Sequence, residues 1–379
     1  MIGSLLFIEV FAIFCYPTVF MDALQDIEFK NIIVRMPNWI GDLVMATPIL
    51  ADLRRTYPDA KITAMCRAPV CDLIKEDPEV DEIFCFSKTS GFARRSDKKI
   101  VIEKLKMGKY DLGILLTHSF SSCWWFWQGR VSNRLGYDCN GRRFLLTKGA
   151  RLPENIDRQH LVTTYKMLLQ PLGIPVSDSH PTLYLSETEV SEAMLLLKQH
   201  GVTEKSDLIG INPGATYGSA KCWLPSRFRE VTEKLLLDPN IYIIYFGDQS
   251  TAALVKEICG GLSSRVINLA GLTSLRELAA LISLCSILLT NDSGPMHIAD
   301  ALGTPILALF GSTNEIVTGP YRTGKVIHKH VECSPCYQRK CPIDFRCMKR
   351  IDSEEVYQEI LMALDQKKQQ QNSLKVLNV

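Results

Sequence analysis

Two polar turns, each at the point where a predicted strand gives way to a helix, carry the residues best suited to chemistry. In the first, Asp42 follows the predicted strand Asn31–Met36. Its carboxylate either caps the next helix or points into a cleft as a general base. The second, Thr290–His297, places Pro295 in the first turn of a helix, where its missing N–H costs nothing. Such a helix start can bind phosphate, and His297 then either faces that ligand or is structural.

A third turn, Asn212–Trp223, follows the first predicted strand of the second half of the chain. Its small residues would let backbone N–H groups approach a phosphate, and Lys221 could supply a positive charge to a diphosphate. The Gly-Lys-Ser/Thr ending of a P-loop is missing, so an ordinary polar turn is the alternative. Asp248 and Gln249 follow another predicted strand, where either could bond a ribose hydroxyl or serve only as a turn residue.

The elements that must position these turns alternate between strands and helices, which favours βαβ units and parallel sheets. We therefore predict two doubly wound α/β domains, whose ligands bind where loops leave the carboxyl ends of the strands. Predicted strands are Asn31–Met36, Lys61–Cys66, Glu82–Phe86, Asp111–Thr117, Leu208–Asn212, Ile241–Phe246, Val266–Leu269, Ile287–Thr290 and Ile306–Phe310. Predicted helices are Gly41–Arg55, Glu187–Gln199, Arg227–Leu237, Ala252–Cys259, Leu275–Leu284, Pro295–Ala301 and Ser353–Leu364.

A proline-rich polar stretch, 172–186, reads as the linker between the domains. The first domain is then 21–184 and the second 185–352, followed by a helix at 353–365 and a polar, disordered tail at 366–379. Residues 1–20 form an apolar extension without a positive flank or a clear cleavage site. It is interpreted as a dispensable extension or an upstream start, with a membrane-associating tail or a signal peptide as alternatives.

Composition sets limits on function. The chain has 379 residues, of which 46% are hydrophobic and 22% are charged, as in soluble proteins with full cores. Its formal net charge of +2 provides no long-range positive field, so a nucleic-acid partner is not expected.

The 13 cysteines are mostly scattered singly on apolar segments, which indicates reduced thiols rather than a disulfide framework. Examples of such scattered thiols are Cys66, Cys85, Cys222 and Cys285. A late cluster departs from this pattern, and it either holds Zn²⁺ in Cys₄ geometry or consists of free or redox-paired thiols. Its members are Cys333, Cys336, Cys341 and Cys347, which lie outside the proposed chemistry.

Basic residues in the first half either form a solvated face or meet an acidic, phosphorylated acceptor at a membrane surface. The candidates for an acceptor contact are Arg94, Arg95, Arg142 and Arg143. The aromatic run Cys123–Trp127 is interpreted as helix core, with a lipid contact as the alternative.

Together these motifs resemble glycosyltransferase family 9, the ADP-heptose:lipopolysaccharide heptosyltransferases, and within it the heptosyltransferase II group. The resemblance covers roughly residues 31 to 360, and its motifs are jointly specific. They are Met36–Asp42, Asn212–Ala215 with Ala220–Trp223, Leu269–Gly271, Thr290–Gly294 with Met296 and His297, and the cysteine cluster beginning at Cys333. The apolar extension 1–20 is not part of the family pattern.

The resemblance implies a GT-B fold, with an acceptor-binding first domain, a nucleotide-sugar-binding second domain and a final helix that packs back on the first domain. It implies an inverting enzyme that requires no metal or other cofactor and takes its heptose from ADP-heptose. Asp42 matches the family's proposed catalytic base. The residues that match its donor contacts are Thr216, Lys221, Asp292, Ser293, Gly294, Met296 and His297. The ribose contact does not carry over cleanly onto Asp248 or Gln249.

The acceptor implied is the heptosyl-Kdo-lipid A inner core, met by a monomer on the cytoplasmic face of the inner membrane. Three alternatives remain open: another family 9 transferase, a GT-B nucleotide-sugar epimerase, and a non-catalytic nucleotide-sugar-binding protein. The epimerase would need additional acid/base residues in both domains, and joint retention of Asp42, Lys221 and His297 argues against a binding protein without turnover.

Overall fold

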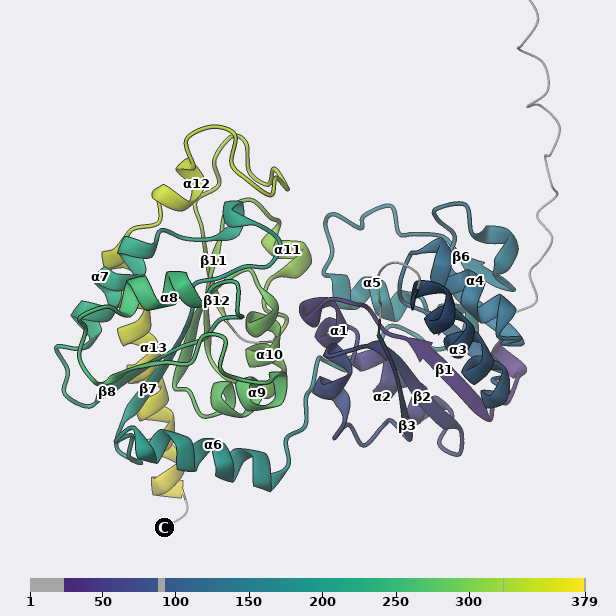
Figure 1. Ribbon diagram of the computed structural model, residues 1–379, viewed down its shortest axis with the longest axis horizontal. Helices are drawn as coiled ribbons and strands as arrows, with labels where there is room; N and C mark the ends of the chain where they lie inside the picture. The colour runs from purple at the N-terminus through teal and green to yellow at the C-terminus, as the bar shows by residue number, and fades with distance from the viewer. Residues whose placement is uncertain (1–23, 88–92, 323, 378–379) are drawn as a thin grey trace, which may run out of the picture.

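A computed structural model describes residues 24–87, 93–322 and 324–377 and contains two α/β domains lying side by side (Figure 1). Each domain is built on a six-stranded parallel sheet. Strand residues alternate between two apolar clusters, as Ile32 and Val34 do on one face of the first sheet and Ile33 on the other. Both faces are therefore covered, which is why these strands are apolar throughout. The apolar extension 1–20 lies outside the described residues.

The two sheets have the same topology. Their orders, β3-β2-β1-β4-β5-β6 and β12-β11-β10-β7-β8-β9, are both the doubly wound order in which the chain reverses between the first and fourth strands. The first sheet contains β1 (Asn31–Arg35), β2 (Lys61–Arg67), β3 (Glu82–Phe86), β4 (Leu112–Leu115), β5 (Asn133–Tyr137) and β6 (Lys148–Ala150). The second contains β7 (Asp207–Asn212), β8 (Ile241–Tyr245), β9 (Val266–Asn268), β10 (Ile287–Asn291), β11 (Ile306–Phe310) and β12 (Lys325–His328).

The predicted α/β class and two-domain GT-B architecture are confirmed, but three strands were not predicted. β5, β6 and β12 lie at or next to the end of a sheet and contain residues such as Arg134 and Lys325. Because strands near an edge are less enclosed, they lack the apolar runs that reveal the central strands.

The helices agree with most predictions, and Glu187–Gln199 and Ala252–Cys259 were predicted with their observed bounds. The predicted helix Gly41–Arg55 is two helices, because Pro48 starts a new one. The helices are α1 (Ile40–Met45), α2 (Pro48–Thr56), α3 (Ala93–Gly108), α4 (Phe120–Gln128), α5 (Leu161–Met167), α6 (Glu187–Gln199), α7 (Pro225–Leu235), α8 (Ala252–Cys259), α9 (Leu275–Ser283), α10 (Gly294–Leu302), α11 (Glu315–Thr318), α12 (Arg346–Lys349) and α13 (Ser353–Leu377).

The final helix corrects two expectations. α13 continues to Leu377 through the segment predicted to be a disordered tail. It packs on the second domain and not back on the first: Val356, Ile360 and Leu364 are buried in the cluster that includes β7 and α7, and α13 contacts α7, β10 and β11 (Figure 1). Its apolar residues recur every four positions, so one stripe of the helix covers the second sheet.

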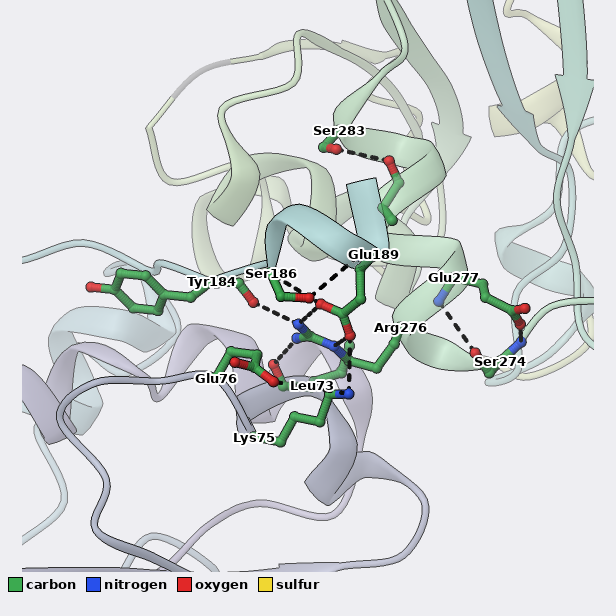
Figure 2. A network of polar contacts seen from close by, with 11 residues as sticks. Leu73, Lys75, Glu76, Tyr184, Ser186, Glu189, Ser274, Arg276, Glu277 and Ser283 are labelled. Atoms are coloured by element: carbon green, nitrogen blue, oxygen red, sulfur yellow. Dashed lines mark hydrogen bonds and ion pairs between the residues drawn. The ribbon is translucent and has the colours of Figure 1, made fainter. Parts of the chain in front are cut away.

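A buried arginine in α9 connects the two domains at a point outside both sheets (Figure 2). Arg276 donates to the carbonyl of Leu73 in the first domain at 3.0 Å and to that of Tyr184 in the linker at 2.8 Å, and it forms a two-pronged pair with Glu189 of α6. Lys75 of the first domain pairs with the same carboxylate at 3.0 Å. These hydrogen bonds hold the pKa of Glu189 well below its usual range.

One expectation about the scattered cysteines was wrong. Cys85 of β3 is bonded to Cys71, because the 3₁₀ helix η2 (Val70–Ile74) lies against the strands and brings the two Cα atoms to 6.0 Å. Cys66, Cys222 and Cys285 are free thiols. Within the described ranges, none of the helices combines the length and apolar character that crossing a membrane requires.

Candidate functional site

The site lies where the first turns of α1 and α10 meet, one helix from each domain. A Cβ atom on Gly41 would come within 2.5 Å of the His297 ring, and one on Gly294 within 2.9 Å of Ile40. Glycine at both positions therefore permits a backbone approach that any larger side chain would prevent. Because Asp42 is the residue after Gly41, this contact also places Asp42 close to the second domain.

Asp42 is half-buried at the start of α1. Burial raises the pKa of its carboxyl group to about 6; Lys221 opposes the rise, and Asp292 adds to it. Both of those residues belong to the second domain, so the carboxylate lies within electrostatic reach of the predicted donor turn. A carboxylate with a pKa near neutral can accept a proton at physiological pH, as a general base must.

Lys221 and Asp292 form a tight ion pair, with the ammonium 2.6 Å from Oδ2 of the carboxylate. The hydroxyl of Thr313 donates to the same oxygen at 2.6 Å. Lys221 also lies 5.0 Å from the centre of the Tyr217 ring. The lysine predicted to meet phosphate is therefore fixed in position by a carboxylate and an aromatic face.

Two asparagines connect the turns after β7 and β10. Asn212 donates to Gly214 O at 3.1 Å and to the Ser293 hydroxyl at 3.0 Å. Asn291 donates to Pro213 O at 2.7 Å and accepts from the backbone N–H of Trp223 at 3.0 Å. These side chains are buried and paired, so they shape the turns without being available to a ligand.

The structure brings together most of the predicted donor residues, but they differ in how far they are buried. Burial lowers the pKa of His297 to about 4, so its ring is neutral at physiological pH. Ser293 and Gly294 are partly exposed at the start of α10, and Thr216 is exposed in the turn after β7. Met296 is fully buried in the apolar cluster shared by the two domains, so its side chain belongs to the core.

The segment carrying the cysteine cluster lies over the donor turn. The Tyr217 hydroxyl donates to Tyr337 O at 2.8 Å, and the N–H of Ala220 donates to Arg339 O at 3.1 Å. A Cβ atom on Gly218 would come within 2.2 Å of the same Arg339 carbonyl. The four cysteines line one cavity of about 190 Å³ together with Ala220.

The predicted ribose contacts lie beside this site. Asp248 accepts from Ser250 and Thr251 at 2.6–3.1 Å and so closes the turn that starts α8. Its carboxylate has this local role whether or not a nucleotide is bound. Gln249 is exposed in the same turn, next to Gly271.

The arginines predicted to contact the acceptor do not share one surface. Arg142 is fully buried and donates to the carbonyls of Thr117 and Tyr137, so it joins the ends of β4 and β5 and is not a surface contact. Arg143 is half-exposed and lies 3.6 Å from Asp138. The side chains of Arg94 and Arg95 are outside the described part of the chain.

Sequence reasoning missed two residues of the first domain near the meeting point of α1 and α10. Tyr165 of α5 is buried, which raises its pKa well above the usual value, and the Asp42 carboxylate adds to this rise. His160 accepts the N–H of Val162 at the start of α5 and meets Gly319 O of the second domain at 2.9 Å. Neither lies in a recognisable motif, so only the folded chain shows that they face the site.

Comparison with known proteins now identifies the family. Residues 100–345, more than half of the chain, match the family model described as glycosyltransferase family 9 (heptosyltransferase). The chain belongs to this family. The predicted family membership and enzyme class, a glycosyltransferase, are confirmed.

Individual relatives agree with the family. The chain is 30% identical to lipooligosaccharide heptosyltransferase 2 of Haemophilus ducreyi, over 80% of this chain and 89% of that one. It is 30% identical to lipopolysaccharide heptosyltransferase 2 of Salmonella typhimurium, over 76% and 85%. Among solved structures, the ADP-heptose lps heptosyltransferase II of E. coli has a TM-score of 0.76 at 27% identity, covering 89% of this chain and 99% of its own.

Proposed function

We propose that this family 9 enzyme transfers a heptose from ADP-L-glycero-D-manno-heptose to the heptosyl-Kdo-lipid A inner core of lipopolysaccharide, with inversion at the anomeric carbon. One observation carries the proposal: α1 and α10 meet at Gly41 and His297, which brings the Asp42 carboxylate of the first domain within electrostatic range of the Lys221–Asp292 pair of the second. A base and a phosphate-type site, each on its own domain, meet where an acceptor hydroxyl and a nucleotide sugar would react.

The reaction is a single displacement. Asp42 removes the proton from an acceptor hydroxyl, and that oxygen attacks the anomeric carbon while the bond to the ADP oxygen breaks. The departing diphosphate gains negative charge, which the Lys221 ammonium and the N-terminal end of α10 stabilise because they are already in place. The neutral His297 ring can hydrogen-bond the sugar or the phosphate without adding a second charge.

Asp292 has a different role from Lys221 in this mechanism. A carboxylate repels phosphate, so its contact with the donor is to hydroxyl groups of the sugar. Through Oδ2 it also aims Lys221 at the diphosphate. Thr313 assists by donating to the same oxygen.

An exposed aromatic surface on the first domain supports an acceptor embedded in a membrane. Trp124 and Trp127 of α4 are 40% and 45% exposed, whereas Cys123 and Phe126 of the same helix are buried. Phe120 stacks on Trp124. Phe144, which is 73% exposed, lies beside Phe120. The expectation that the whole run is helix core was therefore wrong for two of its three tryptophans, Trp124 and Trp127. Exposed tryptophans are typical of protein surfaces at the membrane–water interface.

We therefore place the enzyme, as a monomer, on the cytoplasmic face of the inner membrane, with α4 toward the lipid. Replacing Trp124 and Trp127 together by alanine should weaken sedimentation of the protein with anionic vesicles. Transfer to a detergent-dispersed acceptor should be unchanged. Equal sedimentation of the variant and the wild type would contradict this orientation.

Product analysis tests the central proposal. The purified chain is incubated with ADP-heptose and either Kdo-lipid A or heptosyl-Kdo-lipid A, and the products are examined by mass spectrometry. We expect the mass of one heptose to be added only to the acceptor that already carries a heptose. NMR of the new linkage should show an inverted anomeric configuration. Transfer to Kdo-lipid A alone would instead assign the enzyme to an earlier step.

A further inference from the structure

We propose that Glu315, His328 and His330 form a binding site for a divalent transition-metal ion of the zinc type, separate from the reacting groups. The carboxylate stands at the start of α11, and the two histidines lie at and just beyond the end of β12. One ligand atom from each residue lies within 4.8 Å of the other two. Two imidazoles and one carboxylate are a common protein ligand set for zinc.

Hydrogen bonding fixes how His328 faces the carboxylate. The Ser334 hydroxyl donates its one hydrogen to Gly311 O, so it must accept from Nε2–H of His328, 2.7 Å away. Nδ1 of the same ring lies 2.7 Å from Oε2 of Glu315. Because Nε2 is bonded to Ser334, Nδ1 is the ring nitrogen turned toward the carboxylate, which is the arrangement in which His328 and Glu315 could share one metal ion.

Three further observations favour the metal ion. Ligating histidines usually donate their second N–H to an oxygen of the protein, as His328 does to Ser334. His330 places its Nε2 at 3.5 Å from Oε1 of Glu315, with its ring 4.2 Å from that of His328. No lysine or arginine pairs with Glu315 within the ranges that the structure describes. One metal ion could therefore take one ligand atom from each of the three side chains.

The ion would need only small movements. Around a tetrahedral zinc the ligand atoms are about 3.3 Å apart, given bonds of roughly 2.0–2.1 Å. The side chain of His330 is 71% exposed and can adjust, whereas that of His328 is 3% exposed and already oriented. Solvent can also reach the site from the side of His330 and complete the coordination with water.

The consequence is structural. Asn314, next to Glu315, donates to Asp157 O of the first domain at 2.8 Å, and Gly319 O at the other end of α11 meets His160. Thr313 reaches the donor site through Asp292. An ion joining α11 to β12 would hold this segment, and with it the interdomain contacts, in place (Figure 1).

The test must separate this site from the nearby cysteines, which also bind such metals. The full-length protein is stripped with chelator and titrated with Co²⁺, followed by absorption and calorimetry. We expect one ion per chain with visible d–d bands and no thiolate charge-transfer band in the near ultraviolet. The His330→Ala and Glu315→Gln variants should bind at least tenfold more weakly. Cys336→Ser and His200→Ala, which alter a neighbouring thiol and an exposed distant histidine, should bind like the wild type.

Either of two results would overturn the site. Strong thiolate charge transfer that Cys336→Ser removes and His330→Ala preserves would place the ion on the cysteines. If the stripped protein binds no stoichiometric Co²⁺, Glu315, His328 and His330 are only a hydrogen-bonded cluster and not a metal site. Circular dichroism of each stripped variant verifies that the fold is retained, and the metal should raise the melting temperature of the wild type but not of Glu315→Gln.

Discussion

The two domains share one strand order, yet at the points where they face each other their polar side chains differ in how they are paired. At the reversal point of the second sheet, the polar side chains are paired before any ligand arrives: Asn212 with Ser293, Asn291 with Pro213 O, and Lys221 with Asp292. At the reversal point of the first sheet, no hydrogen bond or ion pair to the Asp42 carboxylate is found within the described chain.

This difference matches the two tasks of the proposed reaction. A diphosphate group carries a permanent negative charge, so a site whose polar groups are already in place can bind it without the cost of ordering them. A base must instead keep its oxygen available for a hydroxyl group that arrives with the acceptor. The approach of Gly41 to His297 joins the two sides, and the Arg276 network joins the domains at a distance.

The largest expected effect concerns the unpaired side of this comparison. Asp42→Asn should reduce kcat by about 10²–10⁴-fold, because general base catalysis contributes that much. ADP binding, measured by calorimetry, should stay within twofold. In the wild type, kcat/KM should fall as the pH drops through about 6, because the base is protonated below the raised pKa of Asp42.

The exposed Asp59→Asn variant of the same domain is the matched control and should keep full activity. Burial raises the pKa of Asp42 above its unfolded value, so ionisation destabilises the folded state once the pH exceeds the usual carboxyl range. Asp42→Asn should therefore melt no lower than the wild type at pH 7.5. Near wild-type transfer by this variant would refute the assignment of the base.

The next largest effect is expected in the second domain, where the polar side chains are already paired. Lys221→Ala removes a charged hydrogen-bond donor, worth about 1.5–3 kcal/mol, so ADP affinity should fall roughly 10- to 100-fold. Because Lys221 opposes the rise in the pKa of Asp42, its loss should also move the acidic limb of the pH profile to higher pH. Lys256→Ala, on an exposed part of α8, should do neither. Unchanged ADP affinity in Lys221→Ala would exclude the phosphate role.

The sequence predicted the central strands and the turns after them, because parallel strands buried on both faces read as apolar runs ending in polar residues. Asp42, Lys221 and His297 could be found from those turns and the family resemblance. The ion pair of Lys221 with Asp292 could not, since its partners are 71 residues apart and no local pattern connects them. Tyr165 and His160 were missed for the same reason.

Errors arose where burial decides a side chain's role. Arg142 and Met296 were assigned to ligands by type and by motif, but both are fully buried. Trp124 and Trp127 were assigned to the core, although one face of α4 is left uncovered. A short segment cannot show which face of a helix or which end of a strand the rest of the chain will cover. The family pattern likewise misplaced α13, whose apolar stripe fits the second sheet.

A smaller effect is expected where the two sides join. In Gly41→Ala, the new methyl group would meet the His297 ring at 2.5 Å, which forces α1 and α10 apart. Overpacking of this kind lowers the stability of the fold by about 1–3 kcal/mol. Because it also moves Asp42 away from the second domain, we expect kcat to fall by roughly tenfold. The double variant with His297→Ala should show no further loss from the methyl group when compared with His297→Ala alone. Gly260→Ala, at an uncrowded position, serves as the control; independent effects of Gly41→Ala and His297→Ala would refute the contact.

The smallest effect is expected at the distant joint between the domains. Arg276→Lys keeps the positive charge but cannot reach Leu73 O, Tyr184 O and both oxygens of Glu189 together (Figure 2). Changes away from the chemistry alter the coupling between sites by about 0.5–2 kcal/mol, and because Arg276→Lys keeps the charge we expect an effect near the low end of this range, a roughly twofold to fivefold change in kcat/KM.

The informative control for this change is Arg229→Lys. Arg229 also bonds a carboxylate and two carbonyl groups, those of Ile258 and Gly260, but all of its partners lie within the second domain. Both variants should lose stability. Only Arg276→Lys should increase the radius of gyration measured by small-angle scattering, and ADP should then reduce that radius more than it does in the wild type. If the two variants behave alike, the α9 network stabilises the fold without setting how the paired and unpaired sides of the site meet.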